Sequence, residues 1–289
     1  MPRSGEPAQA VTGARASSGR GGFREDPLVA SPAATVLTVG GGTTAAIVLA
    51  AGTGSRLRGL WPDLPKGLLE VGGVPLVHRS IETLQACGVR RIVLVAGHRA
   101  DAYRRFLAGR FPEVELRLNP DYGRTGSMGS LYAAQGAVTG PFLLLESDLL
   151  YEPRAVGELL RQPEGDWLLL SGATGQGDEV YAYGSGGRLS QLTKSRRTDA
   201  APLGEFVGIS RLTPALLNAM CARYERRATA RPWYHYDDCL SDLSARHPVR
   251  LHRIEDLVWA EIDDEAQHRR AVEHVLPFLG ERCASAASS

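Results

Sequence analysis

The sequence predicts an α/β fold with a mixed, mostly parallel sheet, helices on both faces and a smaller lobe beside it. Continuous apolar runs, typical of strands buried on both faces, alternate with segments of helical periodicity. Such an alternation indicates strand–helix–strand units. The chain has 289 residues, of which 43% are hydrophobic, so it can build an ordinary buried core.

The alternation begins at residue 45 and accounts for the first half of the fold. Short aliphatic runs predict strands at 45–49, 91–96, 114–118 and 142–146. Helical spacing predicts helices at 76–87, 100–108 and 130–135. The first of these helices should end at Gly88, because glycine commonly terminates helices.

After about residue 165 the pattern becomes more typical of antiparallel strands joined by glycine turns. We expect strands at 167–171, 179–183 and 189–193, and an edge strand at 249–253. We expect helices at 214–227, 237–245 and 266–278. Residues 45–279 are therefore interpreted as a single domain with an inserted small lobe.

The two ends of the chain have a different composition. Gly, Ala, Ser and Pro make up more than half of residues 1–44, which predicts a disordered tail with an optional short strand at 36–39. Residues 280–289 are expected to form a flexible tail. A net charge of +1 disfavours nucleic acid and anionic membranes as partners, and no apolar run approaches the roughly 20 residues of a spanning helix. Four cysteines without a CxxC pair fit a protein of the reducing cytoplasm.

The strongest motif is LAAGTGSRL at 49–57, followed by Pro65-Lys66. Its glycines allow successive backbone N–H groups to approach an anion, and Arg56 and Lys66 can neutralise a triphosphate. Lys66 and Lys194 are the only lysines among 33 basic residues, which suggests positions that need a compact ammonium. A tight strand-to-helix turn without a ligand is the structural alternative. The pattern is not a P-loop, because GxxxxGK[ST] is absent.

This motif resembles the nucleotidyltransferases that join an NTP to a phosphorylated metabolite. It is most similar to the cytidylyltransferases for phosphocholine and 2-aminoethylphosphonate, with further matches at 119–132, 143–151, 204–209 and 259–264. The resemblance spans residues 45–275. It implies a Rossmann-like, nucleotide-diphospho-sugar transferase-like fold with a small substrate-side lobe, and transfer of CMP from CTP with release of pyrophosphate.

The resemblance also implies roles for charged residues. Arg56 and Lys66 would hold the leaving pyrophosphate, and Lys194 would contact the acceptor and the α-phosphate. Asp148 and Asp263 follow apolar strands, where open α/β sheets place ligands, and together they suit Mg²⁺. Either aspartate could instead cap the following helix.

The nucleotide and acceptor contacts complete the predicted site. Nucleotide-binding candidates are Leu49, Ala51, Gly52, Gly54, Ser55, Thr125, Ser127 and Ser130. The last three could instead cap the helix near residue 130. Tyr236, Asp237 and Glu205 are candidates for an amine head group, with core packing or helix capping as the alternative.

We therefore expect CTP and a small phosphonate or phosphoamine as partners, with 2-aminoethylphosphonate favoured and 2-hydroxyethylphosphonate or phosphocholine open. A homodimer is compatible with the sequence. The alternative functions are a sugar-1-phosphate or inositol-1-phosphate nucleotidyltransferase, a glycosyltransferase, and a non-catalytic nucleotide-binding module. Neither the choice of acceptor nor the choice of base follows from any single residue.

Overall fold

The structure is a computed structural model that describes residues 45–57, 61 and 64–279. The two predicted tails and the optional strand at 36–39 lie outside the described residues. None of the helices in the described part of the chain is long and apolar enough to cross a membrane.

Strands and helices alternate along the chain, as expected. The strands are β1 Ala45–Ala50, β2 Glu70–Val71, β3 Val74–Pro75, β4 Arg91–Ala96, β5 Glu115–Leu118, β6 Phe142–Glu146, β7 Leu149–Tyr151, β8 Asp166–Ser171, β9 Tyr181–Ser185, β10 Arg188–Thr193, β11 Gly204–Leu212, β12 Val249–Ile254 and β13 Trp259–Glu261. The α-helices are α1 Leu76–Ala86, α2 Ala100–Arg110, α3 Ser127–Ala133, α4 Arg154–Arg161, α5 Pro214–Arg227, α6 Tyr236–Leu243 and α7 Glu265–Arg270, which continues as a π-helical segment, Ala271–Val275.

Nine strands form one mixed sheet in the order β5-β4-β1-β6-β11-β8-β12-β10-β9. The pairs β1–β4, β1–β6, β4–β5 and β8–β12 are parallel, whereas β11 runs antiparallel to both β6 and β8. The predicted parallel majority is not confirmed, because antiparallel pairings also join β9, β10 and β12. Strands β9 and β10, predicted in a separate lobe, belong to this same sheet.

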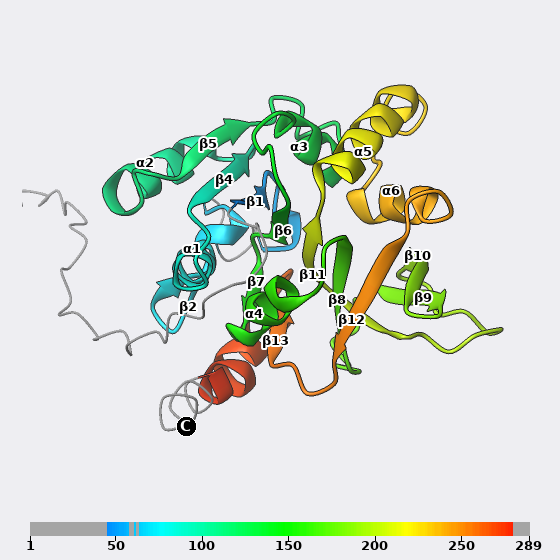
Figure 1. Ribbon diagram of the computed structural model, residues 1–289. Helices are drawn as coiled ribbons and strands as arrows, with labels where there is room; N and C mark the ends of the chain where they lie inside the picture. The colour runs from blue at the N-terminus through cyan, green and yellow to red at the C-terminus, as the bar shows by residue number, and fades with distance from the viewer. Residues whose placement is uncertain (1–44, 58–60, 62–63, 280–289) are drawn as a thin grey trace, which may run out of the picture. The chain divides into compact units, whose positions relative to one another are not determined.

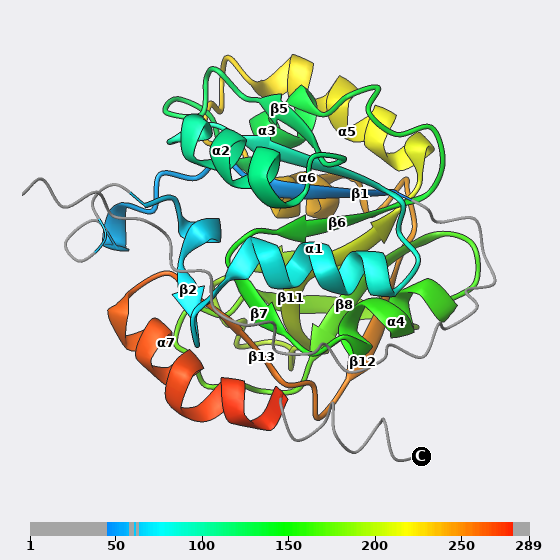
Figure 2. The same cartoon turned by 90° about the vertical axis from the view of Figure 1, so that its left-hand side faces the viewer.

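Helices cover both faces of the sheet, as predicted. Helices α1, α2 and α4 lie over one face, and α3, α5 and α6 lie over the other (Figures 1 and 2). Strand β1 shows why: Ile47 and Leu49 pack in one cluster, whereas Ala46 and Val48 pack in the cluster on the opposite face. Strand β1 is buried along its whole length, which explains its continuous apolar sequence.

Several element boundaries and one strand position differ from the sequence predictions. Helix α3 begins at Ser127 rather than residue 130, and α6 begins at Tyr236. Strand β12 was predicted at an edge but lies between β8 and β10, so that prediction was wrong. Strand β11 was not predicted as a strand, although all nine of its residues are buried.

Two short strands outside the main sheet bring distant segments together at one end of it. Strand β7 follows β6 after a two-residue turn and pairs antiparallel with β13, so that Glu261 lies opposite Leu149. The backbone N–H of Ile262 donates to the carbonyl of Asp148. The residues after β6 and those around the end of β13 are therefore held side by side.

The central strand β6 should dominate the stability of the sheet. Leu144 is 1% exposed, so Leu144→Ala leaves a cavity between sheet and helices and should lower the free energy of unfolding by about 2–5 kcal/mol. Leu118 at the end of edge strand β5 is 47% exposed, and Leu118→Ala should change it by less than about 0.5 kcal/mol. Urea titrations of both variants would measure these values, and equal losses would contradict this assignment of the core.

Candidate active site

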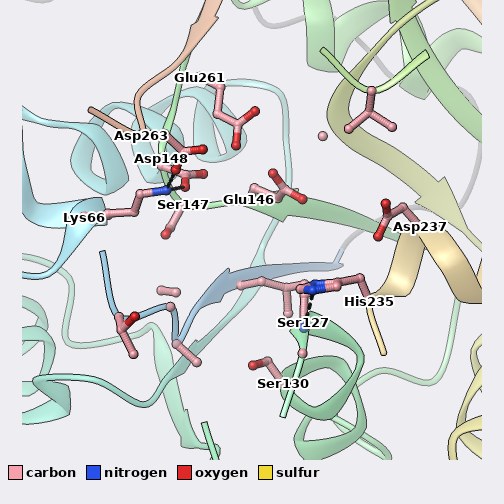
Figure 3. A pocket seen from close by; sticks show the side chains of 18 of the residues that line it. Lys66, Ser127, Ser130, Glu146, Ser147, Asp148, His235, Asp237, Glu261 and Asp263 are labelled. Atoms are coloured by element: carbon pink, nitrogen blue, oxygen red, sulfur yellow. Dashed lines mark hydrogen bonds and ion pairs between the residues drawn. The ribbon is translucent and has the colours of Figure 1, made fainter. Parts of the chain in front are cut away.

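One cavity of about 710 Å³ opens at the carboxyl ends of β1 and β6. Figure 3 shows its labelled side chains converging from several elements. Its lining includes most of the residues predicted from the sequence, namely Leu49, Ala51, Gly52, Gly54, Ser55, Arg56, Lys66, Thr125, Ser127, Ser130, Asp148, Lys194, Asp237 and Asp263. Segments up to 214 residues apart thus meet in one place, as an active site requires.

The glycine loop after β1 forms one wall. Gly54 has a φ of +57°, a conformation that favours glycine. A Cβ atom built there would lie 3.0 Å from Cγ of Lys66. The glycine therefore both turns the chain and lets the Lys66 side chain lie against the loop.

The Lys66 ammonium lies between two carboxylates, those of Asp148 and Asp263 (Figure 3). Its Nζ donates to Asp148 Oδ2 at 2.6 Å and also to Asp263 Oδ1. All three side chains are at most 16% exposed, so this contact is shielded from solvent. The two aspartates predicted as metal ligands are therefore adjacent, with an ammonium between them.

A buried tyrosine fixes the backbone on both sides of this contact. The backbone N–H of Gly67, next to Lys66, donates to the Tyr103 hydroxyl at 3.1 Å. Ser147, next to Asp148, also hydrogen-bonds this hydroxyl, and the backbone N–H of Ser147 donates to the Leu49 carbonyl. Tyr103 is 1% exposed, and its hydroxyl holds the residues next to Lys66 and Asp148 in place.

The other two cations share a carboxylate that no motif predicted. Asp178 accepts from Lys194 Nζ at 2.7 Å and from Arg56 Nη1 at 3.2 Å. Arg56 also pairs with Asp263. All three predicted phosphate-binding cations are therefore engaged by acidic groups.

Carboxylates line the part of the cavity next to Lys66, which we call its acidic side. Carboxylate oxygens of Glu146, Asp148 and Glu261 lie within 4.8 Å of one another. Burial, together with the charges of Glu261 and Asp148, raises the pKa of Glu146 well above its usual range. Burial and Asp148 raise the pKa of Glu261 to about 7. The chain concentrates more negative charge here than the adjacent cations offset.

Glu146 is held by a buried aromatic side chain and a glycine. Tyr236 Oη donates to Glu146 Oε1 at 2.8 Å, and Tyr236 stacks edge-on against Phe206. Gly208, with a φ of +79°, would place a Cβ 3.1 Å from Glu146 Oε2. Tyr236 therefore contributes through Glu146 rather than by lining the cavity itself.

Asp237 completes the acidic side. It follows Tyr236 at the start of α6, and its side chain lines the cavity facing Glu146 (Figure 3). Burial, followed by the neighbouring charge of Asp238, raises the pKa of Asp237. Glu205 lies elsewhere: its buried carboxylate accepts from the N–H and hydroxyl of Thr174 at 2.8 and 2.7 Å. The structure thus does not bring Glu205 into the cavity with the other candidates.

The third wall contains the residues predicted to recognise the base. Asn119 Nδ2 donates to both Thr125 Oγ1 and Ser130 Oγ at 3.1 Å. Ser127 Oγ accepts from the N–H of Tyr236 at 3.2 Å and lies 3.3 Å from Nδ1 of His235. Helix α3 has no side-chain cap, so these hydroxyls do not play the capping role weighed against binding.

The sequence interpretation missed Glu146 and Glu261, although a signal for both was present. Each stands two residues before a predicted metal ligand, Asp148 or Asp263. Each glutamate is the last residue of a strand, at the sheet edge where the following aspartate was placed, so both could have been assigned to the same site. The cap of α7 is Asp264, which accepts from the N–H of Gln267, and not the predicted metal ligand Asp263.

The acidic residues fit a hard divalent cation. The group of Glu146, Asp148 and Glu261 offers only carboxylate oxygens, which are the ligands that Mg²⁺ prefers. Asp148 belongs both to this group and to the predicted pair with Asp263. Any ion bound there would lie beside Lys66, between the cationic and acidic sides of the cavity.

Comparisons with known proteins show the family to which the chain belongs. Residues 46–271 match the model of the MobA-like NTP transferase domain. The CMP-5'-(3-aminopropyl)phosphonate synthase of Streptomyces rubellomurinus is 29% identical over 242 residues, 78% of this chain but 38% of that protein. The 2-aminoethylphosphonate cytidylyltransferase of Lancefieldella rimae is 27% identical over 236 residues, 78% of this chain and 90% of that protein.

Solved structures share the fold. The inositol-1-phosphate CTP transferase of T. maritima superposes with a TM-score of 0.72 at 21% identity, covering 83% of this chain and 98% of that one. The CTP:phosphocholine cytidylyltransferase of Streptococcus pneumoniae gives a TM-score of 0.67 at 20% identity, covering 80% and 98%. The chain therefore belongs to the family of MobA-like NTP transferase domains, which confirms the nucleotidyltransferase resemblance of its motifs.

Proposed function

We propose that this protein transfers CMP from CTP to a small aminoalkyl phosphonate and releases pyrophosphate. The observation that carries the proposal is that one cavity presents three cations and, beside them, the facing carboxylates of Glu146 and Asp237. Arg56, Lys66 and Lys194 complement a triphosphate. Glu146, Asp237 and Glu261 complement a positively charged head group.

The reaction would be an in-line displacement at the α-phosphorus of CTP. A phosphonate oxygen forms the new P–O bond, the bond from the α-phosphorus to the bridging oxygen breaks, and pyrophosphate leaves with that electron pair. The attacking oxygen is already anionic at neutral pH, so no side chain needs to remove a proton. Catalysis then consists of positioning and charge neutralisation.

The cations divide this work by position. Arg56 and Lys66, beside the glycine loop, would hold the β- and γ-phosphates that leave. Lys194, from the residue after β10, would reach the α-phosphate and the phosphonate. Asp148, with Asp263, would hold Mg²⁺ as predicted from the sequence, and the ion when bound would neutralise phosphate charge.

The acidic side favours an amine over an alcohol at the far end of the acceptor. Buried carboxylates without a cation are costly, and an ammonium offsets them while donating hydrogen bonds. Glu146 and Asp237 face each other across a space that such a group could occupy (Figure 3). The names of the two relatives from S. rubellomurinus and L. rimae both include an aminoalkylphosphonate. A sugar or inositol phosphate would leave these charges uncompensated.

A pyrophosphate-release assay tests the proposal directly. CTP, UTP, GTP and ATP would each be combined with 2-aminoethylphosphonate, 2-hydroxyethylphosphonate, phosphocholine and inositol-1-phosphate. We expect the highest kcat/KM for CTP with 2-aminoethylphosphonate. A preference for inositol-1-phosphate would refute the acceptor assignment. If no combination of nucleotide and acceptor released pyrophosphate, the proposed activity would be refuted.

Asp237→Asn separates head-group binding from chemistry. Loss of one charge-assisted hydrogen bond, worth about 1.5–3 kcal/mol, should raise KM for 2-aminoethylphosphonate by roughly 10–100-fold. KM for 2-hydroxyethylphosphonate, which has no ammonium, should change much less. Steady-state kinetics with both acceptors measures the difference. Equal changes for the two acceptors would mean that Asp237 does not contact the amine.

Glu146→Gln should stabilise the protein in the absence of ligands. It removes one of three adjacent carboxylates, while the amide oxygen still accepts from Tyr236. We expect the thermal midpoint at neutral pH to rise by roughly 2–4 °C, equivalent to about 1 kcal/mol.

Glu152→Gln is the matched control for this variant. Glu152 is also buried, but Oε1 accepts from Arg154 at 2.9 Å and from the N–H of Val258 at 3.0 Å. Its charge is compensated, so the same substitution should lower the midpoint. If both variants were destabilised, Glu146 would not be an uncompensated carboxylate.

A further inference from the structure

The loop between β8 and β9 carries an aspartate that joins two cations of the site. Asp178 Oδ1 accepts from Lys194 at 2.7 Å, and Oδ2 accepts from Arg56 at 3.2 and 3.3 Å. Arg56 comes from the glycine loop and Lys194 from the residue after β10. Asp178 therefore connects two elements on different sides of the cavity without lining it.

The loop that presents Asp178 is fastened at its base. Glu205, which is 5% exposed, accepts from both the N–H and the hydroxyl of Thr174. Arg270 donates to the Thr174 carbonyl at 3.3 Å. The N–H of Gly177 donates to Glu179 at 2.8 Å, next to Asp178 itself. Contacts from β11 and α7 thus fix where the aspartate stands.

The two cations need such a partner to keep one position. The side chains of Arg56 and Lys194 are 52% and 57% exposed, and each is long and flexible. Asp178 is 25% exposed. Burial acts to raise its pKa, but hydrogen bonds and charges of Lys194 and Arg56 outweigh burial and lower the pKa. Asp178 is thus ionised at neutral pH and attracts both cations.

We propose that Asp178 is a positioning residue, which holds Arg56 and Lys194 in place and shares their charge with the triphosphate when nucleotide binds. This inference rests on the proposed function, because it assumes that these cations bind phosphate. The aspartate acts only through the two cations. Glu205, expected from the sequence to bind substrate, would then serve the site by anchoring the loop that carries Asp178.

The proposal makes opposite predictions for binding and turnover. Without the negative charge of Asp178, Lys194 loses this competing carboxylate and Arg56 keeps Asp263 as its acidic partner. Both cations then attract phosphate oxygens more strongly, so Asp178→Asn should bind CTP about three- to ten-fold more tightly. Lys194 also loses the partner that fixes it near the reacting atoms, so kcat should fall by about ten-fold. Asp178→Glu restores the charge and should return the Kd of CTP toward the wild-type value.

Calorimetric titration of CTP with Mg²⁺, without acceptor, measures the first effect, and pyrophosphate release measures the second. Asp199→Asn is the control. Asp199 pairs with Arg197 on the surface, so this substitution removes one negative charge outside the cavity. Its Kd and kcat should match those of the wild type.

The possible outcomes distinguish a failure of the role proposed for Asp178 from a failure of the proposed function. Unchanged or weaker CTP binding by Asp178→Asn would overturn the role of Asp178, as would an equal effect in Asp199→Asn. If Asp178→Asn binds more tightly with an unchanged kcat, Asp178 competes for the cations but does not position them, and the proposal fails. If the wild-type protein binds no CTP, the proposed function falls and takes this inference with it.

Discussion

The contact of the Lys66 ammonium with the carboxylates of Asp148 and Asp263 is the interaction on which the site depends. The proposed function requires cations for phosphate and acids for metal or amine to share one cavity, where a buried group without a partner would be costly. The chain meets this constraint by pairing them with each other: Lys66 with two aspartates, and Arg56 and Lys194 with Asp178. These ion pairs offset part of the charge of the cavity in the absence of ligands.

The fold brings these charges together by strand pairing. The carboxyl end of β6 delivers Glu146 and Asp148, and the short β7–β13 pair places Glu261 and Asp263 beside them. The glycine loop after β1 brings Arg56 to the same edge, and Tyr103 fixes the backbone next to Lys66. The cations proposed to bind phosphate and the acids proposed to bind the acceptor therefore come from different elements. The cavity exists because the central strands end at one level.

Sequence reasoning predicted the buried parallel strands because apolar residues fill β1 completely, and β4 and β6 except for Arg91 and Glu146 at one end. It failed at β11, where Ser210 and Arg211 interrupt the apolar run. These polar residues are buried, and the Arg211 guanidinium donates to the carbonyl of Gln162 at 2.6 Å. A partner from a distant segment makes such a residue tolerable in a core, and no local pattern reveals that partner. The edge position expected for β12 failed likewise, because strand order is a property of the whole sheet.

The candidate site, like the fold, could be predicted from the sequence only in part. Arg56 and Lys66 stand in a motif with glycines, so spacing alone indicated their chemistry. Glu146 and Glu261 were missed, although each stands two residues before a predicted metal ligand. Asp178 and Tyr103 lie in segments without a motif, and their roles come from contacts across 122 and 36 residues of chain. Their importance is visible only in three dimensions.

A structure of the protein with CTP and Mg²⁺ bound is the most direct test of the central claim, that one cavity exchanges its internal ion pairs for ligand charge. We expect phosphate oxygens to replace carboxylate oxygens on Lys66, and the α-phosphorus to face Glu146 and Asp237. A complex in which Lys66 still joins Asp148 to Asp263 while the triphosphate lies outside the glycine loop would contradict it.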